Sequence, residues 1–362
     1  MRIKLELRRE PSMAMLVITP VASVLLTMVI GVVVFDLIGI NGFKAVVDIF
    51  LTPILASYKW QDVALKAAPL IIIALGLSIG NRAQVWNIGA EGQYVIGALS
   101  AAGVGIGFGQ SGGFFVILLM VIAGMIGGGA WAAIPAWLRT RFNVNEILSS
   151  LMLTYVALQV LGYLVGGPWK DPNGRNFPAT APLIDSQTLP VWPGSTVHLG
   201  VLVALILPFV FWVIMSRAVF GYQVRVVGSS PNAARHGGFD AMRTIWASLI
   251  IGGAMAGLAG SLEFTGVLHK IDLGFPSGYG FSAIIVAFLG RLNPIGCLVA
   301  GVVLAVTYVG GQMAQSSVHI PNSTAGIFQA MMLFFILASD ILVRYRVRVI
   351  RLAKAPISKA GA

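Results

Sequence analysis

Long apolar segments, separated by short polar stretches, run through almost the whole sequence. A segment of roughly 20 apolar residues is long enough to cross a bilayer as a helix. Hydrophobic residues make up 57% of the 362 residues and charged residues only 10%, whereas a soluble domain has about 25% charged residues. A soluble fold could not cover this much apolar surface, so the sequence predicts a polytopic membrane protein.

About ten segments have the length and composition of transmembrane helices. They cover residues 15–38, 63–80, 93–108, 114–138, 147–166, 199–216, 244–262, 279–289, 295–314 and 325–343, of which the eighth is the shortest. The predicted fold class is therefore all-α, with residues 1–362 forming a single transmembrane domain.

The distribution of basic residues predicts the orientation of these helices, because cytoplasmic loops are enriched in lysine and arginine. With the N-terminus inside and about ten crossings, all but six of the 24 basic residues fall on the inner side. The six on the outer side are Lys44, Lys59, Lys66, Lys170, Arg175 and Lys270. Both chain ends, residues 1–12 and the basic tail 344–362, are therefore expected in the cytoplasm.

The sequence lacks the motifs that several kinds of chemistry require. No lysine follows a glycine, so the P-loop that would bind ATP is missing. The four histidines are scattered without metal-site spacing, and the single cysteine, Cys297, cannot form an intrachain disulfide. The formal charge of +11 comes from basic residues at segment ends and not from a basic stripe. We expect no cofactor on this chain, no enzymatic activity and no nucleic-acid partner.

A dense polar stretch, IGNRAQVWNIGAEGQ at residues 79–93, lies between two apolar segments. Ionisable and amide groups at membrane depth are costly unless they face packed protein or water. Asn87, Glu91 and Gln93 therefore either cap the helix that follows or lie at a helix break on a polar path through the membrane. Gly89 and Gly92 favour a break, because glycine lets the backbone leave helical geometry.

A second polar cluster, NVNEILSS at residues 143–150, precedes the fifth apolar segment. Asn145 and Glu146 are candidates to cap that helix, because amides and carboxylates favour helix N-termini. A position on the same polar path is the alternative. Elsewhere, Gly124 with Gly128 and Gly253 with Gly257 have the spacing that lets helix backbones approach closely.

Two loops are long. The outer loop, residues 167–198, contains six of the 17 prolines and should be ordered by turns and short extended pieces. It is either a passive connector or a docking surface for an external partner. The inner loop, residues 217–243, is a cytoplasmic feature, because it contains no apolar period long enough to span the membrane.

The inner loop has the signals of a short exposed helix. Ser229 or Ser230 can cap it, Pro231 suits its first position, and Gly237 with Gly238 can end it after about two turns. A connection between two spans needs no such helix, so we expect it to dock on a partner. The residues assigned to this contact are Ser230, Pro231, Asn232, Arg235 and Gly237.

Four motifs follow one another along the chain: residues 80–93, RFNVNEILSSLMLTYVA at 141–157, SSPNAARHGG at 229–238, and YGFSAIIVAFLGRLNPIG at 279–296. In this order they resemble the permease subunit of bacterial ABC importers of the ribose and branched-chain amino acid superfamily. The resemblance is strongest to the nucleoside and simple-sugar branch, and it extends over nearly the whole chain.

The resemblance implies a subunit of an ATP-driven importer that moves a nucleoside or simple sugar across the bacterial cytoplasmic (inner) membrane by alternating access. It implies three partners: an ATP-binding subunit that holds ATP and Mg, a second, non-identical permease subunit, and an external substrate-binding protein. Residues 229–238 would then be the coupling helix that sits in a groove of the ATPase.

Other functions remain open at this point. The solute could be another small polar molecule such as an amino acid. A secondary transporter would be driven by an ion gradient and would need no ATPase, whereas a membrane-embedded enzyme would need a nucleophile or metal constellation, and the sequence shows none. Neighbouring genes for an ATP-binding protein and a substrate-binding protein would distinguish an importer subunit from these alternatives.

Overall fold

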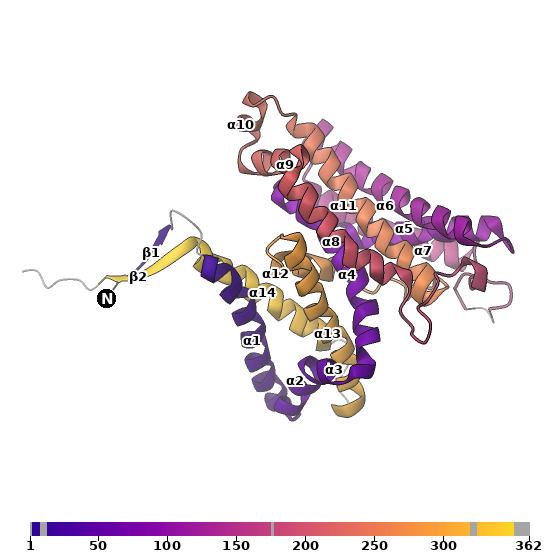
Figure 1. The fold of residues 1–362 in the computed structure, drawn as a ribbon, viewed down its shortest axis with the longest axis horizontal. Helices are drawn as coiled ribbons and strands as arrows, with labels where there is room; N and C mark the ends of the chain where they lie inside the picture. The colour runs from indigo at the N-terminus through magenta and orange to yellow at the C-terminus, as the bar shows by residue number, and fades with distance from the viewer. Residues whose placement is uncertain (1, 8–12, 175–176, 319–323, 351–362) are drawn as a thin grey trace, which may run out of the picture.

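The computed structural model describes residues 2–7, 13–174, 177–318 and 324–350. These residues form a bundle of helices, with one two-stranded ribbon where the two chain ends meet (Figure 1). The principal helices are α1 (Met13–Leu37), α2 (Gly42–Phe50), α3 (Thr52–Leu55), α4 (Trp60–Arg82), α5 (Ala90–Phe108), α6 (Phe114–Phe142), α7 (Glu146–Gly166), α8 (Leu199–Arg217), α9 (Val219–Ser229), α10 (Pro231–His236), α11 (Ala241–Glu263), α12 (Tyr279–Leu289), α13 (Pro294–Val318) and α14 (Thr324–Arg344). Short helical turns lie at Ser57–Lys59, Asp185–Gln187 and Phe264–Leu268.

Each of the ten predicted segments is helical, and α12 has the bounds predicted for the eighth. Seven helices of the described chain are long and apolar enough to cross a membrane: α1, α4, α6, α7, α8, α11 and α13. The helices α12 and α14 have shorter apolar stretches, and Glu91 and Gln93 make α5 less apolar. The prediction of a multi-pass helical membrane protein is confirmed.

The chain ends depart from the all-α prediction. Strand β1 (Arg2–Leu7) pairs antiparallel with β2 (Tyr345–Ile350), and Arg2 lies opposite Ile350. Both strands have alternating sequences, RIKLEL and YRVRVI, and an alternation of period two is typical of strands. The predicted terminal regions therefore contribute a ribbon, and residues 8–12 and 351–362 of those regions lie outside the described residues.

Helices α4 and α11 form the centre of the bundle. In their most apolar stretches, 83% of the α4 residues and 67% of the α11 residues are buried. Helices α5 and α6 pack against α11, and α12 and α13 pack against α4. The predicted close approaches are confirmed, because a Cβ on Gly257 would lie 2.1 Å from the Gly124 carbonyl oxygen and one on Gly128 would lie 2.3 Å from that of Gly253. Glycine at these positions lets α6 and α11 touch through their backbones.

The outer loop, residues 167–198, is ordered by turns and short extended pieces, as predicted, although its residues 175–176 lie outside the described chain. Isolated bridges pair Lys170 with Thr180 and Val191 with His198. The amide of Gln187, itself 2% exposed, donates to carbonyl oxygens at the end of α5 and beyond it, including Ser111 at 2.8 Å. These contacts hold the loop against the helix ends.

Candidate functional site

The chain leaves helical geometry between α4 and α5, at residues 83–89. Gln84 has a positive φ of 58°, and the N–H of Val85 donates to the Gly80 carbonyl at 2.8 Å, which turns the chain away from the α4 axis. The chain is therefore not helical at Asn87. Helix α5 starts at Ala90, earlier than predicted, so Glu91 and Gln93 belong to its first turn and not to the break.

Two buried amides stabilise this break by bonding to each other. Asn87 Nδ2 donates to Gln93 Oε1 at 2.8 Å, and Gln93 Nε2 donates back to Asn87 Oδ1 at 3.1 Å. Asn87 Oδ1 also accepts from the N–H of Gly89. Buried amides need such partners, because an unmade hydrogen bond costs about 1–3 kcal/mol. The pair crosses the break and ties its loop to the first turn of α5.

Glu91 caps a helix, but not the one that contains it. Among the described residues, no side chain caps α5, whereas the Glu91 carboxylate accepts from the N–H of Gly278 at 2.9 Å and from that of Gly280 at 2.6 Å, at the start of α12. Glu91 is only 2% exposed. A carboxylate is stabilised at a helix N-terminus by unpaired N–H groups and the helix dipole. This contact fixes the start of α12 to the first turn of α5.

Beyond Glu91 lies a cluster of aromatic rings from α5, α12, α13 and the segment that precedes α12. The ring of Tyr94 stacks on Phe275 at a centroid distance of 5.2 Å, and Tyr279 meets Tyr94 edge-on at 6.0 Å. Tyr308 meets Tyr279 edge-on at 5.6 Å. The Lys66 ammonium lies 5.4 Å from the Tyr279 ring centroid, an arrangement in which the ring face attracts the cation.

Polar groups surround these rings. Glu263, 4% exposed at the end of α11, interacts electrostatically with Lys66 and Tyr94. The Ser282 hydroxyl lies 2.8 Å from that of Tyr308 and donates to Gln329 Oε1 at 3.1 Å. Tyr94 Oη and Gln329 Nε2 are buried and have no hydrogen-bond partner among the described residues. The cluster therefore combines ring faces, a cation, a carboxylate and polar atoms that could bind a solute.

The sequence prediction missed this cluster. Lys66 and Glu263 carried a usable signal, because ionisable residues inside apolar segments are by default functional candidates. Tyr94, Tyr279 and Gln329 carried none, since amphipathic residues in apolar helices have many ordinary positions. Only the packing of α4, α5, α11, α12 and α14 brings these side chains together.

Asn145 and Glu146 have different positions at the start of α7. Asn145 Oδ1 accepts from the N–H of Ile147 at 2.9 Å. Asn145 therefore caps the helix that follows it, which is the first of the two alternatives given for this residue. Glu146 forms an ion pair with Arg139 and accepts from the N–H of Trp86 at 3.3 Å. Glu146 therefore joins α6 and α7 to the helix break.

The predicted short helix in the inner loop is confirmed as α10. Ser230 Oγ accepts from the N–H of Ala233 at 3.3 Å, Pro231 is the first helical residue and Gly237 follows the last. Asn232 and Arg235 are both exposed, as are Pro231 and Gly237. The preceding helix, α9, connects α10 to the body of the protein.

Helix α9 rests directly on the end of α4. A Cβ on Gly228 would lie 1.9 Å from the carbonyl oxygen of Arg82, the last residue of α4. Beyond it, Trp86 in the break stacks on Phe288 of α12 at 5.4 Å. A continuous set of contacts thus joins exposed α10, through α9 and the break, to α5 and α12.

The known proteins that this chain resembles are permeases. Residues 60–337 match the family described as branched-chain amino acid transport system / permease component. A glucose ABC transporter permease protein of Haloferax volcanii is 34% identical, covering 91% of this chain and 89% of its own length. A guanosine ABC transporter permease protein of Bacillus subtilis is 29% identical, covering 76% and 79%. A nucleoside ABC transporter permease protein of Lactococcus lactis is 24% identical, covering 88% and 90%. No solved structure matches the chain.

Proposed function

The chain belongs to the family of branched-chain amino acid transport system permease components, and we propose that it carries a nucleoside or a simple sugar into the cell. It is a permease subunit of an ABC transporter and not an enzyme, since ATP hydrolysis belongs to a separate subunit of such transporters. Relatives named for glucose, guanosine and nucleosides support this solute class over an amino acid.

The working complex contains a cytoplasmic ATP-binding subunit holding ATP and Mg, a second, non-identical permease, and an external substrate-binding protein. It lies in a bacterial inner membrane. The outer loop offers the binding protein an exposed surface that includes Phe177, Val191 and Trp192, which are 75%, 53% and 70% exposed. Large apolar side chains at a protein surface are typical of interaction sites.

The chain crosses the membrane ten times, with α5, α12 and α14 completing the seven longer spans, and both ends are cytoplasmic. Two observations support this topology. The pairing of β1 with β2 brings the two ends together. Helices α2 and α3 lie at the ends of α1 and α4 opposite to the ribbon and to α10 (Figure 1).

The mechanism is alternating access, and the observation that carries it is the contact of Gly228 with the end of α4. ATP binding moves the ATPase, which pushes on α10. Because α9 rests on the helix break, this displacement reaches Asn87, Gln93 and Glu91, and through Glu91 it reaches the start of α12. The aromatic and polar cluster then changes the side to which it opens.

The cluster, whose residues Tyr94, Tyr279 and Glu263 are buried here, would give the solute a weak site once this movement opens it. Sugar hydroxyls can bond to Gln329 and Glu263, and a flat ring can stack against Tyr94 or Tyr279. A path with few polar groups is expected, because tight binding in the permease would slow release. Specificity then rests largely with the external binding protein.

The coupling assignment is tested in liposomes that contain the complete importer. Arg235→Ala, in exposed α10, should abolish solute uptake and its coupling to ATP hydrolysis, while assembly stays normal. Arg217→Ala, at the end of α8, is the matched control and should transport normally. If Arg235→Ala and a deletion of residues 231–237 both retain full uptake, α10 is not the coupling element.

A further inference from the structure

The ribbon formed by β1 and β2 has two different faces. Residues opposite each other in an antiparallel pair lie on the same face, and successive residues along a strand alternate between the faces. One face combines the basic residues of both strands with one acidic residue and one apolar residue: Arg2, Lys4, Glu6, Arg346, Arg348 and Ile350. The other face is apolar and consists of Ile3, Leu5, Leu7, Tyr345, Val347 and Val349.

The ribbon projects from the bundle. It extends away from the helices, beyond the ends of α1 and α14 (Figure 1). A two-stranded ribbon by itself is at best marginally stable in water, and an apolar face exposed to water adds to the cost. The apolar face therefore needs a cover from outside the described bundle.

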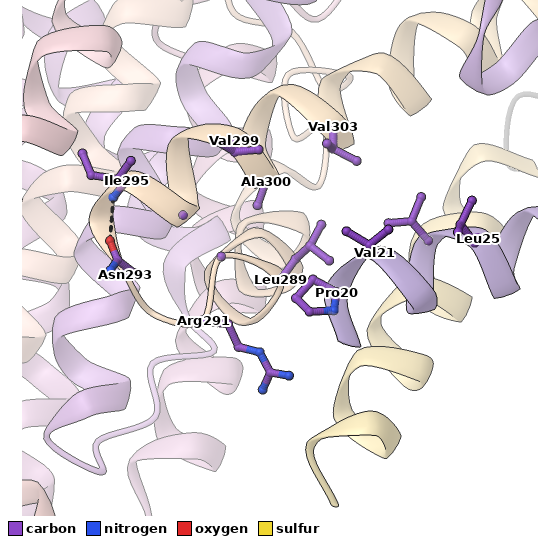
Figure 2. Close-up of a pocket in the computed structure, with 13 residues that line it drawn as sticks. Pro20, Val21, Leu25, Leu289, Arg291, Asn293, Ile295, Val299, Ala300 and Val303 are labelled. Carbon is purple, nitrogen blue, oxygen red and sulfur yellow. Dashed lines mark hydrogen bonds between the residues drawn. The ribbon is translucent and has the colours of Figure 1, made fainter. Parts of the chain in front are cut away.

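The helices next to the ribbon lie at the edge of the bundle. Helix α14 leads directly into β2 and packs on α1, but a groove of about 540 Å³ separates α1 from the start of α13. Figure 2 shows Val21 and Leu25 of α1 on one side of this groove and Val299 of α13 on the other. Val21 and Leu25 are each 55% exposed. The ribbon is therefore attached at the margin of the bundle, where the surrounding bilayer begins.

Helix α14 brings the ribbon to the level of the membrane surface. Its apolar run ends at the first charged residues, Asp340 and Arg344, and β2 begins at the next residue, Tyr345. The helix rises by roughly 6 Å from Asp340 to Arg344, and the headgroup region on each side of a bilayer is roughly 5–8 Å thick. Tyrosine is enriched at this level. The ribbon therefore starts where the lipid headgroups lie.

We propose that the ribbon docks on the membrane surface, with its apolar face on the bilayer and its basic residues bound to anionic phospholipid headgroups. Basic residues clustered next to a transmembrane helix are typical of such binding. The strand pairing adds Arg2 and Lys4, from the other end of the chain, to the basic residues of β2. Charge complementarity favours an anionic bilayer, which offers apolar and negatively charged groups along its whole surface, whereas a protein partner would need an apolar patch bordered by acidic residues.

The docking is tested on the full chain, assembled with cysteine-free partner subunits in nanodiscs of phosphatidylcholine alone or mixed with phosphatidylglycerol. Cys297 is the one cysteine of the chain, so in a Cys297→Ala background a fluorescent label can be attached at Leu5→Cys on the apolar face or at Glu6→Cys on the basic face. In the mixed discs, brominated acyl chains should quench the label at position 5 several-fold more than the label at position 6. Aqueous iodide should show the opposite preference.

Removal of charge tests the part played by the headgroups. Arg346→Gln combined with Arg348→Gln should lower the ratio of docked to free ribbon about 30-fold in the mixed discs, since a basic residue near an anionic surface contributes about 1 kcal/mol. The matched control combines Arg141→Gln with Arg217→Gln, at exposed positions in the last turns of α6 and α8, and should dock as the unsubstituted protein does.

A second measurement covers the case in which the charge variant weakens the ribbon itself. High salt screens charges at a surface, so it should reduce quenching at position 5 in the mixed discs without any substitution in β2. Equal quenching at positions 5 and 6, equal quenching in the two kinds of nanodisc, or crosslinking of Leu5→Cys to another subunit in place of quenching would overturn the proposal.

Discussion

The carboxylate of Glu91 in α5 accepts the backbone N–H of Gly280 in α12 at 2.6 Å, across 189 positions of sequence. Gly280 has no room for a side chain, since a Cβ there would lie 2.2 Å from the backbone nitrogen of Glu91. A charged cap and a direct backbone contact therefore meet at one point. This point lies between the helix break and the aromatic cluster, so movement of one should be transmitted to the other.

Replacing Glu91 by glutamine tests the charged cap. Glutamine has the same shape as glutamate, but its NH₂ group replaces one of the two carboxylate oxygens that accept a backbone N–H. One of these N–H donors would then face another donor. We expect the free energy of unfolding to fall by about 1.5–3 kcal/mol, the contribution of hydrogen bonds to a charged group, and uptake to fall with it. Thermal unfolding of the purified complex and a transport assay measure the two effects. Unchanged stability and uptake would show that the charge at Glu91 has no part in either.

The tight contact at Gly280 predicts a strong effect of a single methyl group. Gly280→Ala should separate α5 from α12 and destabilise the protein by about 3 kcal/mol, because overpacking against backbone cannot be relieved by a rotamer change. Gly107→Ala in α5 is the matched control, since a Cβ at Gly107 meets nothing within 4 Å. Detergent-solubilised yield and the thermal midpoint should fall for the first variant alone.

The amide pair Asn87–Gln93 is suited to a double-mutant cycle. Asn87→Leu or Gln93→Leu alone leaves the other amide buried and unsatisfied, at a cost of about 1–3 kcal/mol. The double variant should lose less than the sum of the two, with a coupling free energy of about 1 kcal/mol. Strictly additive losses would mean that the two amides do not stabilise each other.

The outer loop should make stability depend on pH. Burial, with a smaller effect of His269, lowers the pKa of His198 from 6.5 to about 4. Between these values the unfolded chain takes up a proton that the folded protein does not, so stability is full above pH 6.5 and falls as the pH drops towards 4. The loss between pH 7 and pH 5 should be about 2 kcal/mol.

Thermal unfolding of two variants isolates this effect. His198 Nδ1 accepts from the N–H of Gly200, and asparagine can also cap a helix. His198→Asn should therefore fold normally and lose the pH dependence between pH 7 and pH 5. His236→Asn, in exposed α10, should behave as the wild type. A wild-type protein equally stable at both pH values would mean that His198 is protonated in the folded state.

Local signals in the sequence were enough for some of these features. Ser230 and Pro231 predicted where α10 begins, and the polar residues with Gly89 predicted the break between α4 and α5. The partner of Glu91 could not be predicted, because a cap supplied from 189 positions away depends on tertiary packing. The same holds for the electrostatic interaction between Lys66 and Glu263. The alternation in RIKLEL and YRVRVI is typical of strands, but the all-α prediction missed it, and neither segment indicates its pairing partner.

Solute uptake by liposomes that contain this chain, the second permease, the ATPase and the external binding protein tests the central claim most directly. Labelled nucleosides and sugars are offered on the binding-protein side, with ATP and Mg supplied to the ATPase, in the presence or absence of an ion gradient. The account predicts uptake that requires ATP and the binding protein and that continues when ionophores collapse the gradient. Uptake that follows the gradient and proceeds without ATP would identify a secondary transporter and contradict the account.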